Sequence, residues 1–330
     1  SRTDRMNLET PQLPAADLDH VLEHTRDLWT RLQGESVLIT GGTGTVGRWL
    51  LESFTHINQA LELQARAVVL TRSPEQFAAR APHLAADPAV HLIRGDVRNF
   101  DPADLSSAIE DGSSGRIPFV VHAATATGSR SANGAPFRAL DTLYSGTRRV
   151  LEWAVTQQSP RVLLLSSSAV YDASRDQVFP ISEDFAGAPS ANSPANALAE
   201  GKRVMELLGA IFREQYRLDC KTARCFPCLG PGMSLEGHHP VGGFIHDALC
   251  GSAMHVPGDG TTMGSYLYLA DLAIWLWTIM LRDSTSSVFN VGSDEAFSLL
   301  TVAERVAALG PHRVPLVQTC CSALPVADHD

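Results

Sequence analysis

Hydrophobic and polar positions alternate along the chain in a pattern typical of strands followed by helices. Nearly continuous apolar runs predict strands at residues 36–40, 67–71, 90–94, 119–123, 161–166 and 221–225. The segments between them are long enough for helices, at 46–57, 74–84, 102–110, 137–157 and 196–216. Such alternation indicates a parallel sheet covered by helices on both faces. We therefore predict an α/β fold, built on a Rossmann-type doubly wound parallel sheet.

The two ends of the chain differ from this pattern. Residues 16–33 carry apolar side chains at helical spacing and predict an amphipathic leader helix that packs on the rest of the protein. Residues 229–263 are rich in Gly, Pro and His, which is typical of loops in a smaller lobe. Helices are predicted at 271–282 and 300–308, and a strand at 288–292. We expect a leader at 1–33, a main domain at 34–228 and a lobe formed mainly by 229–330, with 266–292 returning to the main domain.

Composition excludes several classes of protein. The 330 residues are 44% hydrophobic and 19% charged, with a net charge of −10 and a pI near 5.6, which argues against nucleic-acid or anionic-membrane partners. The longest apolar stretch, 267–281, contains Asp271 and is too short to span a bilayer. The first residues show no signal-peptide pattern, so we expect a cytoplasmic protein.

The six cysteines do not suggest a disulfide framework in a chain of this length. Cys225 and Cys228 have the spacing of a redox motif, but they follow a predicted buried strand. A reactive pair needs an exposed helix N-terminus. We expect both to be structural thiols.

A glycine-rich turn joins the first predicted strand to the first predicted helix of the alternating region. It reads Gly41, Gly42, Thr43, Gly44, Thr45, Val46 and Gly47. Gly41 allows the tight turn, Gly44 lets a pyrophosphate approach the backbone amides, and Gly47 lets the helix pack closely on the strand. The helix N-terminus then offers unpaired N–H groups to phosphate. Strand, turn and helix together predict a dinucleotide site.

Residues after the other strands would complete this site. Arg72 follows the second strand where an acidic residue would bind the ribose of NAD, and an arginine can instead accommodate the 2′-phosphate of NADP. This slightly favours NADP over NAD. Asp96 and Val97 are expected at the adenine edge. His122, Ala123 and Ala124 end the fourth strand near the nicotinamide ribose, where His122 could also be a buried structural histidine.

These residues together resemble the extended short-chain dehydrogenase/reductase family, in its NAD-dependent epimerase/dehydratase branch. The motifs that carry the resemblance lie at residues 40–47, 94–97, 166–171, 201–206, 223–226, 230–231, 258–260, 265–268 and 290–292. The resemblance implies a Rossmann domain, a smaller C-terminal substrate lobe, and a homodimer built from helices 137–157 and 196–216.

The chain departs from this family at the position of the catalytic tyrosine. The family carries Tyr-x-x-x-Lys, in which the lysine lowers the pKa of the phenol so that it can exchange a proton while hydride moves. Here Lys202 is present, but Leu198 occupies the tyrosine position. The accompanying Ser is present as Ser167. Where a family dehydratase has an acidic pair, this chain has Ser168 and Ala169, which disfavours the usual sugar dehydration.

The predicted substrate lobe departs as well. Gly264 and His246 stand where the family usually places two arginines that bind the diphosphate of a nucleotide sugar. Losing both guanidiniums removes bidentate phosphate recognition, at a cost of a few kcal/mol as an order of magnitude. These departures favour a hydrophobic small-molecule substrate over a nucleotide sugar.

Several groups are candidates for proton transfer in place of the missing phenol. Ser167 and Lys202 come first by position, although Lys202 could instead only hold the cofactor's ribose. Tyr171 is a substrate-wall residue or a substitute acid, and Tyr144 could reach the vacant position from its helix. His238, His239 and His246 fall in the substrate-loop region, where a histidine titrates near neutral pH. No metal site is expected. Glu200 and Glu206 are expected on a solvated helix face.

Three functions fit these residues. The first, slightly favoured, is an enzyme on this scaffold that runs a non-redox isomerisation, cyclisation or elimination on a hydrophobic metabolite, such as a polyketide-like intermediate. Orientation in a shaped pocket can accelerate such reactions. The second is an NAD(P)-dependent nucleotide-sugar epimerase, dehydratase or reductase with a substitute acid. The third is a catalytically silent cofactor-binding protein.

Overall fold

The computed structural model describes residues 10–107, 116–125, 136–157, 160–171, 180–235 and 240–319. The chain forms two compact units. The first consists of Ser1–Gly232 and Leu267–Gly292, and the second of Met233–Tyr266 and Ser293–Asp330. The chain therefore leaves the first unit after Gly232, returns to it at Leu267, and leaves it again after Gly292.

A seven-stranded sheet lies at the centre of the first unit, in the order β11-β6-β5-β4-β1-β2-β3. All its strand pairs are parallel. The strands are β1 (Ser36–Thr40), β2 (Arg66–Thr71), β3 (Val90–Arg94), β4 (Phe119–His122), β5 (Arg161–Ser167), β6 (Asp219–Cys225) and β11 (Val288–Val291). This confirms the predicted doubly wound α/β fold. A parallel sheet presents the carboxyl ends of its strands at one edge, where ligands of such folds bind.

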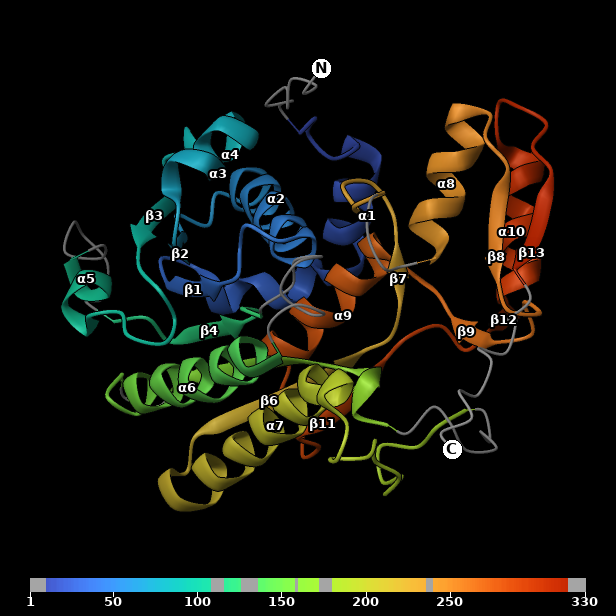
Figure 1. The fold of residues 1–330 in the computed structure, drawn as a ribbon. Coiled ribbons are helices and arrows are strands. Elements are labelled where there is room, and N and C mark those ends of the chain that lie inside the picture. Colours follow the sequence, from blue (N-terminus) through green and yellow to red (C-terminus); the bar gives the residue numbers. More distant parts are fainter. Residues whose placement is uncertain are drawn as a thin grey trace. The chain divides into compact units, whose positions relative to one another are not determined.

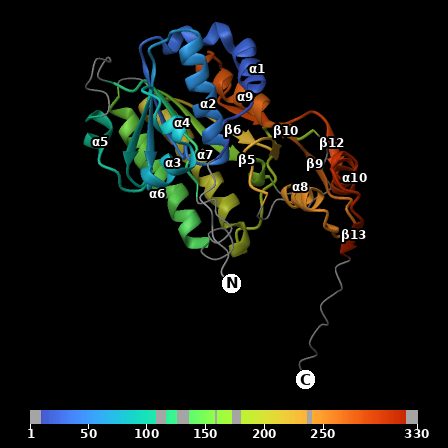
Figure 2. The ribbon, with the colours of Figure 1, turned by 90° about the horizontal axis from the view of Figure 1, so that it is seen from above.

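Helices cover both faces of this sheet, as Figures 1 and 2 show. They are α1 (Ala15–Thr25), α2 (Thr45–Ala60), α3 (Pro74–Arg80), α4 (Pro82–Ala85), α5 (Pro102–Ser107), α6 (Pro136–Val155), α7 (Ala197–Tyr216) and α9 (Leu269–Leu281). The helices α6 and α7 pack against each other on one face, while α1, α2 and α9 pack together on the other. A short parallel pair, β7 (Cys228–Leu229) with β10 (Leu267–Tyr268), completes the unit.

Each face of the sheet has its own apolar core. On the α6 and α7 face, the core includes fully buried Leu143, Val150 and Met205 packed against the strands. On the other face, the rings of Trp29, Phe54 and Trp277 contact one another, with the two indole centroids 4.8 Å apart. Strands apolar on both sides are explained by this double cover.

Two predicted helices are interrupted in the structure. The leader helix ends at Thr25 and continues as a 3₁₀-helix over Arg26–Leu32. The Thr25 hydroxyl donates to the Val21 carbonyl and accepts from the indole N–H of Trp29, 2.8 Å away, which stabilises the change of helix type. The helix predicted at 74–84 is two helices, because Pro82 has no N–H to continue the first one.

The second unit is smaller and is built from α8 (Pro240–Cys250), α10 (Leu299–Leu309), β8 (Met254–Pro257), β9 (Met263–Ser265), β12 (Ala296–Ser298) and β13 (Leu316–Thr319). β8 pairs with β13 in parallel and β9 pairs with β12 in antiparallel fashion. Both helices pack on β8 and on each other, so the unit has a small core of its own.

None of the helices in the described parts of the chain has the length and apolar character needed to cross a membrane.

Candidate dinucleotide and substrate site

The turn between β1 and α2 has no room for side chains at two of its glycines. Gly41 has a φ of 72°, and a β-carbon there would lie 2.6 Å from the carbonyl carbon of Ala123. At Gly47, a β-carbon would lie 2.3 Å from the Gly41 carbonyl oxygen. Both clashes are with backbone atoms, which cannot rotate away. The glycines therefore let the chain fold back tightly and bring α2 against the turn.

This turn presents the N-terminus of α2 at the carboxyl edge of the sheet. No side chain caps the helix, whose N-cap residue is Gly44, and both Thr43 and Gly44 are exposed. Thr45 and Val46, which open the helix, are half-buried. An uncapped N-terminus behind a glycine turn binds phosphate through backbone N–H groups and the helix dipole. The free N–H groups of the first turn of α2 and the space left at Gly41 and Gly47 both fit the pyrophosphate of a dinucleotide.

The end of β4 lies beside the same turn. The Ala123 N–H donates to the Thr40 carbonyl at 3.1 Å, and the Ala124 N–H lies 3.4 Å from the Thr40 hydroxyl. Next to them, the buried Thr125 hydroxyl has no hydrogen-bond partner within the described parts of the chain. A buried polar atom without a partner is uncommon. It supplies a free hydrogen-bonding group at the edge where the dinucleotide would lie.

His122 is part of the interior rather than of the surface that a cofactor would touch. Its ring is fully buried, with Nδ1 2.7 Å from the Thr40 hydroxyl and Nε2 3.0 Å from the Thr147 hydroxyl. Burial, together with the nearby Lys202 charge, lowers the pKa of His122 to about 3, so the ring is neutral. The side chain links β1, β4 and α6, which corrects the expectation that it contacts the ribose.

Asp96 and Val97, the residues expected at the adenine edge, make contacts within the protein. Arg98 donates to Asp96 at 2.9 Å and to Asp141 of α6 at 2.9 Å. The Arg98 hydrogen bond lowers the pKa of Asp96. Val97 is buried and would be 2.7 Å from a β-carbon on Gly146. Arg72 follows β2 with an exposed side chain. Of these residues, Arg72 has the side chain that is open to a ligand.

Lys202 lies at the junction of α7 and β5. Its side chain is buried, and its ammonium donates to the carbonyl of Leu165 at 2.5 Å. Burial lowers the pKa of Lys202 to about 8, although nearby Cys225 and Glu206 act in the opposite direction. An amine with a pKa close to neutral pH can exchange a proton under working conditions.

Leu198 lies one turn before Lys202 on the same face of α7. It is half-buried and packs against the apolar core on the α6 and α7 side of the sheet. Ser167, the last residue of β5, is half-buried, and its hydroxyl accepts the Ala169 N–H at 3.2 Å. The hydroxyl hydrogen of Ser167 thus remains free to be donated to a substrate oxygen.

A charge network beside Lys202 was not expected from the sequence. Glu206 is not on a solvated face: its side chain is 13% exposed, accepts from the Ser166 hydroxyl at 2.5 Å and forms an ion pair with Arg224 at 2.7 Å. The expectation for Glu206 was therefore wrong, because α7 turns this position toward β5 and β6. An arginine in an otherwise buried strand was the signal that could have revealed it, since a buried charge needs a partner. Glu200 pairs with Arg203 at 3.6 Å and is half-buried.

The two candidate tyrosines do not approach Lys202 through a hydrogen bond. Tyr171 is 4% exposed, and its hydroxyl donates to Asn290 Oδ1 and accepts from Arg224, both at 2.7 Å. Its phenol is thus part of the Arg224 network. Tyr144 is 42% exposed on α6, where it lies beside Arg148. The structure therefore places Leu198 one turn before Lys202 on α7, sets Ser167 at the end of β5, and leaves both phenols engaged elsewhere.

Cys225 and Cys228 are partly buried thiols. Burial raises the pKa of Cys225 to about 12 and that of Cys228 to about 11. Thiolate is the reactive form of cysteine, so these values describe inert thiols.

The substrate-lobe positions lie in the second unit. His246 is half-exposed on α8, next to Asp247. Gly264 is in β9, where a β-carbon would lie 2.9 Å from the Tyr266 hydroxyl. An arginine at this position would require the Tyr266 ring to move. His238 and His239 lie outside the described residues. Within the described ranges, no group of three or more His, Cys, Asp or Glu could hold a metal ion.

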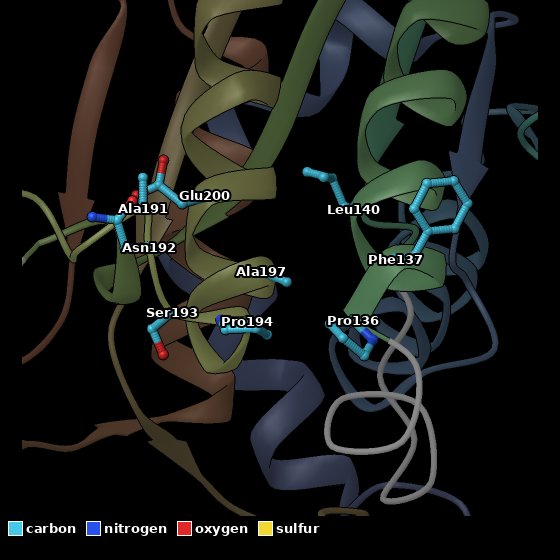
Figure 3. A pocket seen from close by; sticks show the side chains of 9 residues that line it. All are labelled: Pro136, Phe137, Leu140, Ala191, Asn192, Ser193, Pro194, Ala197 and Glu200. Carbon is cyan, nitrogen blue, oxygen red and sulfur yellow. The ribbon is translucent and has the colours of Figure 1, made fainter.

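A separate pocket lies between α6 and the N-terminal end of α7, with a volume of about 290 Å³. Leu140 and Ala197 face each other across it (Figure 3). It is lined by Pro136, Phe137, Leu140, Ala191, Asn192, Ser193, Pro194, Ala197 and Glu200. At 100° per residue, Ala197 and Glu200 lie on the face of α7 opposite Leu198 and Lys202. The pocket is therefore distinct from the dinucleotide site.

Comparison with known proteins agrees with this geometry. The sequence profile of the NAD dependent epimerase/dehydratase family matches residues 37–292. This chain belongs to the NAD-dependent epimerase/dehydratase family. UDP-glucuronic acid decarboxylase 6 of Arabidopsis thaliana is 28% identical over 273 residues, which cover 83% of this chain and 74% of the relative.

Two solved structures of similar fold are an epimerase and a protein bound to a nucleotide sugar. The epimerase Mth375 of Methanothermobacter thermautotrophicus superimposes with a TM-score of 0.74 at 21% identity, covering 91% of this chain and 84% of the other. MoeE5, solved in complex with UDP-glucose and NAD, has a TM-score of 0.67 at 25% identity, covering 86% and 85%. The likeness to Mth375 shows that the present chain has the same fold as that epimerase.

Replacing Gly47 by alanine should damage both folding and the dinucleotide site. We expect Gly47→Ala to lower the free energy of unfolding by about 2 kcal/mol or more, because the new methyl group meets backbone. We also expect at least about tenfold weaker dinucleotide binding. Gly243→Ala is the control: that helical glycine has open space around it, and alanine there should stabilise by about 0.5–1 kcal/mol. Urea unfolding and calorimetric titration measure both effects, and unchanged affinity in Gly47→Ala would contradict the assignment.

The buried amine should make stability depend on pH in a defined window. The pKa of Lys202 is about 8 in the folded chain against 10.5 for an ordinary lysine, so the unfolded chain binds more protons between these values. The free energy of unfolding should therefore rise between about pH 8 and 10.5 as the buried charge is lost. Lys202→Met should lack this rise, as measured by urea unfolding across the window. Equal pH dependence in both proteins would show that the amine is not desolvated.

Proposed function

We propose that this chain is an NAD-dependent enzyme that acts on a nucleotide sugar and exchanges hydride with it, using a proton-transfer group other than a phenol at position 198. The observation that carries this proposal is the meeting, at one edge of the sheet, of the glycine cradle and the buried Lys202 amine. Membership of the family supports it. The relative solved with UDP-glucose and NAD and the relative named as a UDP-glucuronic acid decarboxylase support the substrate class.

The chain's own residues divide the work in this proposal. The uncapped first turn of α2 holds the pyrophosphate, and the missing β-carbons at Gly41 and Gly47 give it room. A bound nicotinamide dinucleotide supplies hydride transfer. Ser167 donates its hydroxyl hydrogen to the reacting oxygen. Lys202, with a pKa of about 8, holds or releases the proton near that oxygen.

The choice between NAD and NADP depends on Arg72 in this proposal. Its exposed side chain follows β2, where a guanidinium can bind a 2′-phosphate. This supports use of NADP as well as NAD. Titration of the protein with both dinucleotides compares the two affinities, and NAD binding with no detectable NADP binding would remove Arg72 from the cofactor site.

A second candidate function is a non-redox isomerisation, cyclisation or elimination on a hydrophobic metabolite. The apolar packing of Leu198 favours it, because that side chain places an apolar wall where the proton-transfer group of the family would lie. Tyr266 beside Gly264 also favours it, since no guanidinium there would bind a diphosphate.

Hydride exchange separates the two candidates. We expect the purified protein, given UDP-glucose or UDP-glucuronic acid, to show transient absorbance at about 340 nm and to move a deuterium label between substrate and dinucleotide. A non-redox enzyme would turn over its substrate with neither signal. Turnover without label transfer would therefore overturn the first proposal in favour of the second.

Leu198→Tyr is the matched variant for the same assay. If hydride exchange is retained with a weaker acid, a phenol beside Lys202 should raise its rate by about 10²–10⁴. Loss of the natural activity in Leu198→Tyr, with Leu198→Met close to wild type, would indicate that the apolar wall is needed.

We also propose that the protein is a homodimer formed through α6 and α7. Phe137 is 81% exposed and Leu207 is 59% exposed. Leu207 lies two turns after Glu200, on the face of α7 that borders the pocket. Exposed apolar side chains on neighbouring helices are typical of an interface.

Light scattering should give the mass of a dimer for the wild type and of a monomer for Leu207→Glu. Leu309→Glu, at an 87% exposed leucine of α10 in the second unit, should stay dimeric. A monomeric wild type at micromolar concentration would contradict the proposal.

A further inference from the structure

A cysteine, a histidine and an aspartate lie together at the C-terminal end of α8 in the second unit. Cys250 Sγ is 3.7 Å from His246 Nε2, since the two residues are one helical turn apart. On the other side of the ring, His246 Nδ1 is 3.5 Å from Asp247 Oδ1. The imidazole of His246 thus lies between the thiol of Cys250 and the carboxylate of Asp247. They belong to none of the interactions of the dinucleotide site.

Cys250 differs from the other described cysteines. Burial raises the pKa of Cys220 and Cys225 to about 12 and that of Cys228 to about 11. Cys250 is exposed, and an imidazole nitrogen lies within reach of its thiol. Among the described thiols, Cys250 is thus the one that is both accessible to a solute and in contact with a base.

The surroundings of the cluster determine what its histidine can do. A carboxylate near Nδ1 favours the tautomer with hydrogen on Nδ1, which leaves the Nε2 lone pair directed at the thiol. His312 approaches from the segment after α10, where a β-carbon on Gly251 would be 3.4 Å from its ring. The described residues contain no group of three that could hold a metal ion, so a metal does not explain the cluster.

The end of α8 fixes the position of the thiol relative to the imidazole. Cys250 is the last residue of α8, and His246 lies one helical turn before it, so the two side chains share one side of the helix end.

We propose that Cys250, with His246 and Asp247, is a site of thiol–disulfide exchange with low-molecular-weight disulfides such as oxidised glutathione. His246 Nε2 takes the proton of Cys250, and the thiolate attacks one sulfur of the disulfide. The S–S bond of the small molecule breaks as a new S–S bond to Cys250 forms. The leaving thiolate takes a proton from the His246 ring or from water, so one disulfide is consumed and one is made.

The test follows mixed-disulfide formation at each cysteine of the full chain. Protein is incubated with oxidised glutathione near neutral pH, quenched with acid and maleimide, and mapped by peptide mass spectrometry. We expect Cys250 to react at least about tenfold faster than Cys228. His246→Ala should slow Cys250 by about tenfold, and Asp247→Asn should slow it less, because the carboxylate acts through the ring.

His255→Ala is the matched control, at an exposed histidine on β8 of the same unit. It should leave the rate at Cys250 unchanged, and circular dichroism verifies that all variants keep their helices. The proposal is overturned if Cys250 reacts no faster than Cys228. It is also overturned if His246→Ala and His255→Ala react at the wild-type rate, since Cys250 would then be an ordinary exposed thiol.

Discussion

In the first unit, the carbonyl oxygen of Gly41 lies 2.3 Å from where a β-carbon on residue 47 would be, and the backbone of Ala123 is almost as close to residue 41. This close approach joins β1, β4 and α2 at a single point. The uncapped N-terminus of α2, the edge of the central sheet and the buried hydroxyl of Thr125 are placed by it. The shape of the candidate dinucleotide site thus depends on Gly41 and Gly47, which have no β-carbons to keep these backbone segments apart.

The second constraint is the balance of charge at the junction of α7 with β5 and β6. Lys202 is buried next to the Glu206–Arg224 pair, and its amine is held by the Leu165 carbonyl. A single turn of α7 therefore separates one buried ammonium from one paired carboxylate. At the position where the resemblance to the family predicts a phenol, this chain has the apolar side chain of Leu198, and we propose that the amine and Ser167 act in its place.

Much of the fold could be predicted because the apolar pattern directly reports burial. Strand β1 begins and ends at the predicted residues, since a parallel strand covered on both faces is apolar throughout. The bounds of the edge strand β3 were also predicted, although only Val90 of its five residues is buried. The interruptions were less visible. Pro82 was a sign of a break between α3 and α4, whereas the change at Thr25 depends on a hydrogen bond to Trp29. Glu206 was misplaced because its partners Ser166 and Arg224 lie 40 and 18 residues away along the chain.

The sequence by itself determined the strand–helix order, the glycine turn and the apolar residue at position 198, four residues before Lys202, because these are properties of neighbouring residues. Only the tertiary structure decided which polar groups are free and which are used. His122 and Tyr171 looked available in the sequence, but their partners come from other elements of the sheet and from α6. Cys250 showed no motif, yet a single helical turn brings it to a histidine. Burial and hydrogen bonds between distant segments determine which side chains are protonated and which are accessible to a ligand. Neither can be known before the chain has folded.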